Sequence, residues 1–233
     1  MNINLTPKPI NFKFGEYINK AFELLKKDFG SIFVGFLVTF LMSIIPFCGY
    51  LAMGNFYKFL RNKSKGIPAS PGDIFNFDDF VPYLILQLII LAGIVAVYLP
   101  IIFMIPATAY VDPEMGRTGL PIFFYLYMMV FYVVFFFFIV KGFYIMALIS
   151  LKKVTDIKTA WKMSVIMTKD NFFNILVFCI AVSLLGSLGI IACGIGILFT
   201  LPFAYTANYF AFEDAMEQIS YDEITEIGTE ENV

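Results

Sequence analysis

The 42 residues from 171 to 212 contain no charged side chain, and this apolar stretch limits what the chain can form. A helix needs about 20 apolar residues to cross the hydrocarbon core of a bilayer, so the stretch is long enough for two crossings. Cys193 lies close to its middle. The sequence therefore predicts two membrane-spanning helices, over residues 171–191 and 193–212, with a turn near Cys193.

The composition extends this prediction to the whole chain. Apolar residues make up 60% and charged residues 15% of the 233 residues. In an ordinary soluble domain about a quarter of the residues are charged. We therefore expect a single membrane domain over residues 1–214. Residues 215–233 are rich in acidic side chains, contain no basic one, and are predicted to form an acidic cytoplasmic tail.

The remaining spans are predicted from apolar runs and from the segments that separate them. Residues 14–29 alternate apolar and charged side chains as an amphipathic helix does, which suits the lipid interface. Residues 29–60 are apolar but contain Pro46, so they form either one kinked helix or two short spans, and the charge pattern favours two. The six predicted spans cover residues 30–46, 47–61, 82–110, 121–151, 171–191 and 193–212.

The distribution of basic residues predicts the orientation. Cytoplasmic loops of membrane proteins carry an excess of Lys and Arg. Almost all the basic residues fall in three clusters, which are Lys8, Lys13, Lys20, Lys26 and Lys27, then Lys58, Arg61, Lys63 and Lys65, then Lys152, Lys153, Lys158, Lys162 and Lys169. The connector over 111–120 has only Arg117. These positions predict a multi-pass protein of the cell membrane with both termini in the cytoplasm.

The predicted fold is an all-α integral membrane protein with six transmembrane helices. They are arranged as three hairpins, each preceded by an interfacial amphipathic helix. Before the third hairpin, Thr155 or Asp156 can cap such a helix, and residues 73–80 repeat the pattern in a shorter form before the second. The recurring order of features indicates a helical hairpin repeat, although chance similarity between apolar segments explains it equally well.

The residue types exclude several kinds of chemistry. The chain has no histidine, which excludes histidine-based acid–base catalysis and histidine metal ligands. Nucleotide-binding glycine motifs and a basic groove with interleaved aromatic residues are also missing, so nucleotides and nucleic acids are not expected as ligands. Asp78 and Asp79 could hold a cation, but solvated acidic caps are the favoured interpretation. We predict no catalytic, cofactor-binding or metal-binding residues and no cofactor.

Two polar residues within the predicted spans form a candidate intramembrane polar site. Lys141 lies about ten residues from the cytoplasmic end of the fourth span, and Gln87 lies in the third. A charge inside a membrane is costly and is often functional. The alternative is that the long Lys141 side chain extends to the lipid interface. Because no acidic residue lies within any predicted span, both interpretations stay open.

The order of features resembles a broad group of uncharacterised bacterial multi-pass membrane proteins. This group is related to the membrane domain of some glycerophosphodiester phosphodiesterases. The matching stretches are IIPFCGYLAMGNFYKFLRNKSKGIP over 44–68, DIFNFDDF over 73–80, AWKMSVIMTKDNFFNILV over 160–177, and ACGIGILFTLPFAYTANYFAFED over 192–214. The printed sequence lacks the phosphodiesterase catalytic domain, so the resemblance implies no catalytic residues. It implies a bacterial inner-membrane protein.

The function expected from the sequence is that of a non-enzymatic inner-membrane scaffold or accessory subunit. The lipid bilayer would be its main partner, and the acidic tail and interfacial helices could contact other proteins. The alternative is a membrane transport component, such as the permease subunit of an exporter.

Overall fold

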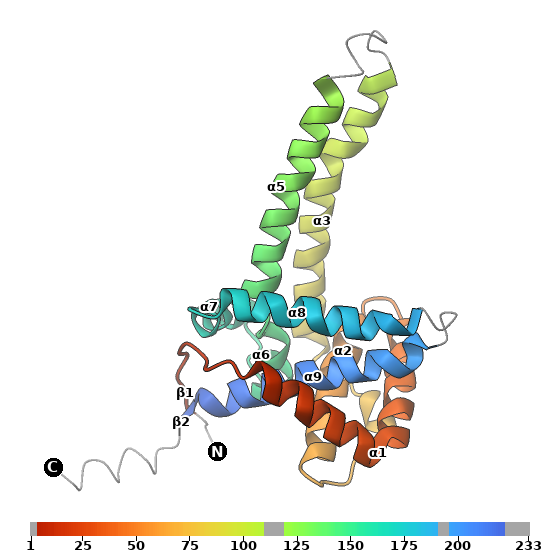
Figure 1. The fold of residues 1–233 in the computed structure, drawn as a ribbon, viewed down its shortest axis with the longest axis vertical. Helices are drawn as coiled ribbons and strands as arrows, with labels where there is room; N and C mark the ends of the chain where they lie inside the picture. The colour runs from red at the N-terminus through yellow and green to blue at the C-terminus, as the bar shows by residue number, and fades with distance from the viewer. Residues whose placement is uncertain (1–3, 110–118, 191–195, 222–233) are drawn as a thin grey trace, which may run out of the picture.

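Two long apolar helices, α3 (Phe80–Ala109) and α5 (Gly119–Lys141), project side by side from a body of shorter helices (Figure 1). The computed structural model describes residues 4–109, 119–190 and 196–221. The other elements are β1 (Asn4–Leu5), α1 (Phe14–Ser43), α2 (Gly49–Ser64), η1 (Pro71–Ile74), α6 (Ile145–Lys152), α7 (Ile157–Met167), α8 (Phe172–Ser187), η2 (Leu188–Ile190), α9 (Ile197–Gln218) and β2 (Ser220–Tyr221). We refer to α3 and α5 together as the apolar hairpin.

Three segments of the described helices are long and apolar enough to cross a membrane. They are Phe80–Ile102, Phe124–Lys152 and Phe172–Ile190. Only 6% of the most apolar part of the first segment is buried inside the protein, compared with 39% and 28% for the other two. The chain is therefore mainly helical, with three candidate membrane-spanning helices, and one of these has almost no protein around it.

Three of the six predicted spans do not form helices of this kind in the described residues. The predicted span over 30–46 belongs to α1, whose backbone leaves the helical conformation at Asp28 and so leaves only about 15 helical residues, roughly 22 Å. α2 stands in place of the span over 47–61, but it has 16 residues and basic side chains in its last turn. α9 covers most of 193–212, where tyrosine, threonine, asparagine and proline lower the hydropathy.

The predicted span over residues 121–151 is interrupted. α5 ends at Lys141, and a new helix, α6, begins at Ile145. A side chain from α7 fills part of the break, because Ser164 Oγ donates to the carbonyl of Lys141 at 2.6 Å and accepts from the amide of Tyr144 at 3.2 Å. These hydrogen bonds replace helical ones, so the interruption leaves these two backbone groups paired.

The segments that precede the three helix pairs differ from one another. α1 begins at Phe14, and its buried side chains Tyr17 and Ala21 pack with residues of α8 and α9, whereas Phe22 on the same helix is 66% exposed. Protein therefore covers only part of the predicted apolar face. Before α3 there is only the single turn of η1, not an amphipathic helix. α7 begins as predicted, because Asp156 is its N-cap and accepts a hydrogen bond from the amide of Thr159.

The chain after residue 214 is still part of the folded body. α9 continues to Gln218, and Ala215, Met216 and Ile219 are fully buried. β2 then pairs antiparallel with β1, which brings the two ends of the described chain together. The fold thus extends into the first residues of the predicted acidic tail, and residues 222–233 lie outside the described part.

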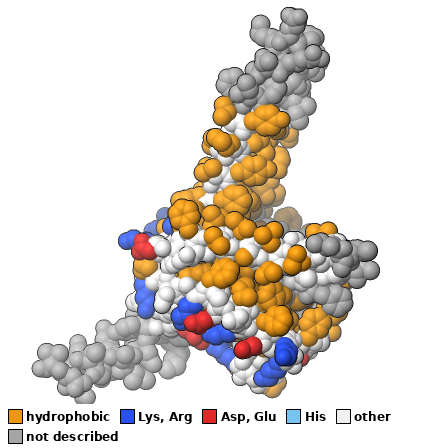
Figure 2. Space-filling model, viewed as in Figure 1, with side chains coloured by type: hydrophobic (Ala, Val, Ile, Leu, Met, Phe, Trp, Pro, Cys, Tyr) orange, Lys and Arg blue, Asp and Glu red, His pale blue; other side chains and the backbone are white. Residues whose placement is uncertain are grey.

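Charged and apolar side chains occupy different parts of the surface. Apolar side chains cover much of the described part of the apolar hairpin on the face shown and continue onto the adjoining part of the body (Figure 2). Lysine, arginine, aspartate and glutamate side chains gather along the margins of the body, and the lower margin is farthest from the hairpin. In the described residues of α3 and α5, the only charged side chain is Lys141, at the end of α5.

Gly54 allows α2, α3 and α6 to meet within the body. Tyr83 on α3 passes next to it, hydrogen-bonds to Ser150 on α6, and donates to the carbonyl of Met146 at 3.2 Å. A Cβ atom at Gly54 would overlap both the Tyr83 and the Ser150 hydroxyl groups. The base of the hairpin is therefore fixed to the body at a contact that has no room for a side chain.

We expect Gly54→Ala to destabilise the purified protein in detergent by about 1–3 kcal/mol, the usual cost of overpacking a well-filled contact. Gly93→Ala is the matched control, because a Cβ at that position of α3 meets nothing within 4 Å. Alanine favours a helix over glycine, so the control should be neutral or slightly stabilising. Thermal unfolding of both variants checks this, and equal melting temperatures would contradict the packing described.

Candidate functional site at the base of the apolar hairpin

A buried carboxylate lies immediately before the first residue of α3. The Asp79 side chain is 7% exposed, and two lysines from different elements pair with it. Lys153 Nζ lies 2.9 Å from Oδ1 and 3.0 Å from Oδ2, and Lys58 Nζ forms a short ion pair with Oδ2. Lys58 is on α2, and Lys153 follows α6 in a left-handed backbone conformation. We call these three residues the Asp79 cluster.

An asparagine extends the Asp79 cluster to the loop that leads into α3. Asn55 Nδ2 donates to the carbonyl oxygens of Ile74 at 2.9 Å and Asn76 at 2.6 Å. Its Oδ1 accepts a hydrogen bond from Lys58 Nζ at 3.1 Å. The loop before α3 is thus held to α2 in two ways. Asn55 donates to its backbone carbonyl groups, and Lys58 pairs with the Asp79 carboxylate.

The pKa values in the cluster reflect burial and pairing. Burial is the largest influence on Asp79 and by itself would raise the pKa of the carboxyl group, but the hydrogen bonds and charges of Lys58 and Lys153 outweigh it and hold that pKa below its ordinary value. Burial also dominates at Lys58, where it lowers the pKa of the ammonium group although Asp79 acts in the opposite direction. At neutral pH the cluster therefore contains an ionised carboxylate.

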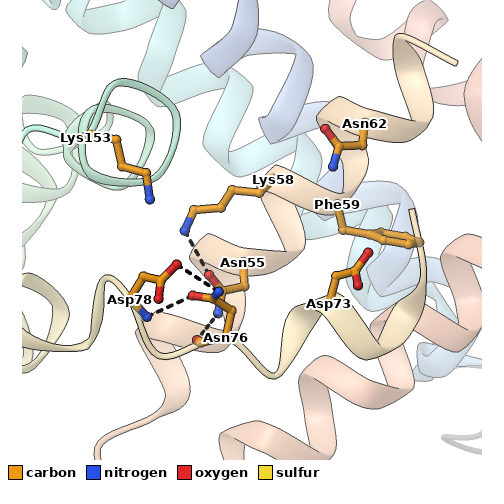
Figure 3. Close-up of a pocket in the computed structure, with 8 residues that line it drawn as sticks. All are labelled: Asn55, Lys58, Phe59, Asn62, Asp73, Asn76, Asp78 and Lys153. Atoms are coloured by element: carbon orange, nitrogen blue, oxygen red, sulfur yellow. Dashed lines mark hydrogen bonds between the residues drawn. The ribbon is translucent and has the colours of Figure 1, made fainter. Parts of the chain in front are cut away.

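A pocket of about 260 Å³ lies beside the cluster. Lys58 and Lys153 converge on it from two elements, opposite the loop that carries Asn76 and Asp78 (Figure 3). Asp78 is already engaged, because it accepts from Asn76 Nδ2 at 2.9 Å. The two lysines that line the pocket are both paired with Asp79, so the arrangement acts as a clamp on the start of α3. Among the described residues, no three histidine, cysteine or acidic side chains lie close enough together to hold a metal ion.

Two further ion clusters connect α9 to the rest of the body. Glu213 pairs with Arg61 Nε at 2.9 Å and with Lys65 Nζ at 2.6 Å. Asp214 accepts from the Tyr17 hydroxyl at 2.7 Å and pairs with Lys13 Nζ at 3.1 Å. Both carboxylates are mostly buried and lie at the point where the uncharged stretch of the sequence ends. Their role is to fasten α9 to α1 and α2.

The two predicted site residues lie in the helices of the hairpin, but among the described residues no hydrogen bond joins them. Lys141 is the last residue of α5, so it ends the apolar helix rather than interrupting it. Within the described part of the chain, its ammonium group has no ion pair. Gln87 is on α3, and its Oε1 is buried without a hydrogen-bond partner. Their proposed joint role is therefore still a prediction.

Sequence reasoning missed the Asp79 cluster. It treated Asp78 and Asp79 as a pair of solvated caps, whereas the structure leaves Asp78 exposed and buries Asp79. The three members of the cluster are separated by 21 and 74 residues in the chain. A usable signal was the position of Asp79, because an acidic residue directly before a long apolar run is close to a helix N-terminus and needs a partner if it is buried.

Comparison with known proteins gives no match. No protein family, curated protein or solved structure is similar enough to this chain to inform its function.

We expect Asp79→Asn to lower the free energy of unfolding by about 1–2 kcal/mol, because it leaves two lysines side by side without a counter-charge. The figure is below that for a fully buried pair, since the Lys153 side chain is 58% exposed and can be solvated. Asp78→Asn is the control, and it should change stability by much less. Chemical unfolding in detergent at neutral pH compares the two variants.

The difference between wild type and Asp79→Asn should depend on pH. Because the folded protein holds the pKa of Asp79 below its ordinary value, the stabilisation is complete above about pH 4. It is lost as the pH falls further through the folded-state pKa. A stability difference that stays constant from pH 7 to pH 3 would contradict an ionised, paired Asp79.

Proposed function

We propose that this chain is a non-enzymatic scaffold or accessory subunit embedded in the inner membrane, with the apolar hairpin crossing the bilayer. One observation carries the proposal: the hairpin has an uncovered apolar surface, and the charged residues that the structure describes lie on the body or at the hairpin's base. The resemblance to bacterial multi-pass membrane proteins agrees with this placement and adds no activity.

The length of the hairpin supports a full crossing. α5 has 23 residues, which at 1.5 Å per residue gives about 35 Å. The hydrocarbon core of a bilayer is about 30 Å thick. Exposed apolar side chains run along α5 from Tyr125 to Ile139, and Lys141 follows as the helix ends. A crossing would place Lys141 and the body at one lipid interface.

The other helices would then remain on the same side of the membrane. α8 runs across the base of the hairpin rather than along it (Figure 1). Its exposed side chains include Phe173, Val177 and Leu184, so it would lie at the boundary between headgroups and acyl chains. In this arrangement the predicted six crossings become two, with the pairs α1–α2 and α8–α9 embedded in one leaflet.

The orientation follows from the ends of the chain and from the lysines. Because β1 pairs with β2, the two ends of the described chain lie on the same side. The body has nearly all the basic residues, and positive residues favour the cytoplasmic side. We therefore place the body and both termini in the cytoplasm, as the sequence predicts.

A scaffold is favoured over an enzyme by the state of the polar side chains. The carboxylates Asp79, Glu213 and Asp214 are paired within the body, where they connect helices. Such pairing stabilises a shape and leaves few groups for proton transfer or nucleophilic attack. The accessible surface, apolar on one side and charged on the other, suits contacts with lipid and with protein partners.

The alternative function is that of a membrane transport component, and one observation favours it. Gln87 Oε1 is buried without a partner in α3, and buried polar groups of this kind are rare unless a water molecule or a ligand satisfies them. The Tyr144 hydroxyl is the second such group among the described residues, and two are still fewer than the several polar groups at one depth that transport sites combine. The scaffold is therefore the function we propose.

Affinity purification and reconstitution test the proposal. The full-length chain, extracted from its native membrane in mild detergent, should co-purify with at least one protein in a fixed ratio. A variant that ends after Tyr221, which removes the acidic tail but keeps β2, should lose this partner while keeping its melting temperature. Proteoliposomes that contain the chain alone should show no solute flux. A chain that purifies alone and transports a solute after reconstitution would contradict the proposal.

A further inference from the structure

Three lysines lie on or just after α7, the helix that contacts the end of α5. α7 is fixed at this place by the hydrogen bond between Ser164 and the carbonyl of Lys141, and by Trp161, whose ring lies 5.5 Å from that of Phe138 on α5. Lys158 and Lys162 are on α7, and Lys169 follows it by two residues. We call this region, with Lys141, the α7 corner.

The lysines of the α7 corner have no ion-pair partners in the described part of the chain. This sets them apart from the lysines of the Asp79, Glu213 and Asp214 clusters, which neutralise buried carboxylates. The three later lysines are exposed and Lys141 is half-exposed. The positive charge of the corner is therefore available to a ligand.

Two acidic residues adjoin the corner and leave its charge positive. Asp156 caps α7 and already accepts hydrogen bonds from the amide and the hydroxyl of Thr159. Asp170 is exposed and follows Lys169 directly. Against four lysines, these two carboxylates leave a local excess of positive charge, which favours a negatively charged partner.

Exposed apolar side chains adjoin these lysines along the chain. Ile166 is four residues after Lys162, and Phe173 is four residues after Lys169, and both are exposed. Ala160, Met163 and Met167 lie on the opposite face of α7 and are buried. A partner of this surface must therefore offer negative charge next to apolar groups, which is the chemistry of an anionic phospholipid.

We propose that the α7 corner binds the headgroup of an anionic phospholipid, with the phosphodiester between the lysines and the acyl chains beside Phe173 and α5. The inference rests on the proposed placement of the hairpin in the bilayer, which brings the corner to headgroup level. Tryptophan and lysine are both enriched at that level, and Trp161 is the only tryptophan of the chain. An acidic segment of another protein would match the charge but would leave the exposed apolar side chains without a partner.

Quenching of Trp161 fluorescence tests the proposal on the full chain in bilayers. The protein is reconstituted in phosphatidylcholine vesicles that contain a fixed fraction of brominated phosphatidylglycerol or, for comparison, of brominated phosphatidylcholine. We expect the brominated phosphatidylglycerol to quench more strongly, because the anionic lipid is enriched at the corner. The double variant Lys158→Gln with Lys162→Gln should lose the preference, with the relative association constant falling about fivefold for each lysine removed.

The matched control is Lys26→Gln with Lys27→Gln. These two lysines are exposed on α1 and, in the described residues, have no ion pair. This variant removes the same charge from elsewhere on the body and should keep the preference for phosphatidylglycerol. Both variants should keep the wild-type melting temperature in detergent.

The outcomes separate the lipid site from the membrane placement. Equal quenching by the two brominated lipids would overturn the headgroup site and leave the placement of the hairpin intact. No quenching by either lipid would overturn the placement itself, and with it the site. A preference that survives in the α7 double variant would also overturn the site, because the anionic lipid would then bind elsewhere. Loss of a co-purifying acidic protein in that variant, without any lipid preference in the wild type, would assign the corner to protein docking instead.

Discussion

The architecture depends on one constraint, which is that the apolar hairpin cannot remain in water. Moving one large apolar side chain from water to an apolar environment is worth about 1.5–3 kcal/mol, and α3 and α5 expose many of them. The body does not cover this surface, since only 6% of the most apolar part of α3 is buried. Each helix of the pair satisfies its own backbone hydrogen bonds, so lipid can cover the apolar side chains that the body leaves exposed.

Polar contacts connect both helices of the apolar hairpin to the body at the base of the hairpin. Asp79 ties the first residue of α3 to α2 and to the chain after α6, while Ser164 ties the end of α5 to α7. Between them, Tyr83 joins α3 to α6 in a space that Gly54 keeps open. These contacts fix the hairpin relative to the helices of the body, as the proposed scaffold role requires.

The helical class and three apolar helices could be predicted from the sequence, whereas the predicted six spans and the polar contacts of the body could not. Uncharged runs located α3, α5 and α8, and the pair Thr155 and Asp156 offered two candidate caps for α7, of which Asp156 is the cap. The break after Lys141 could not be found by hydropathy, because it depends on how the end of α5 packs on α7. The burial of Asp79 was missed for the same reason, since its lysine partners come from distant parts of the chain.

The side of the membrane on which the two ends of the hairpin lie is the most direct test of this account. Arg117, in the connection between α3 and α5, is replaced by cysteine in a chain whose native cysteines are replaced by alanine, and intact cells are treated with a membrane-impermeant maleimide. The account predicts that Arg117→Cys reacts in intact cells, whereas Lys26→Cys on α1 reacts only after lysis. If Arg117→Cys also reacts only after lysis, the hairpin does not cross the membrane and the account is contradicted.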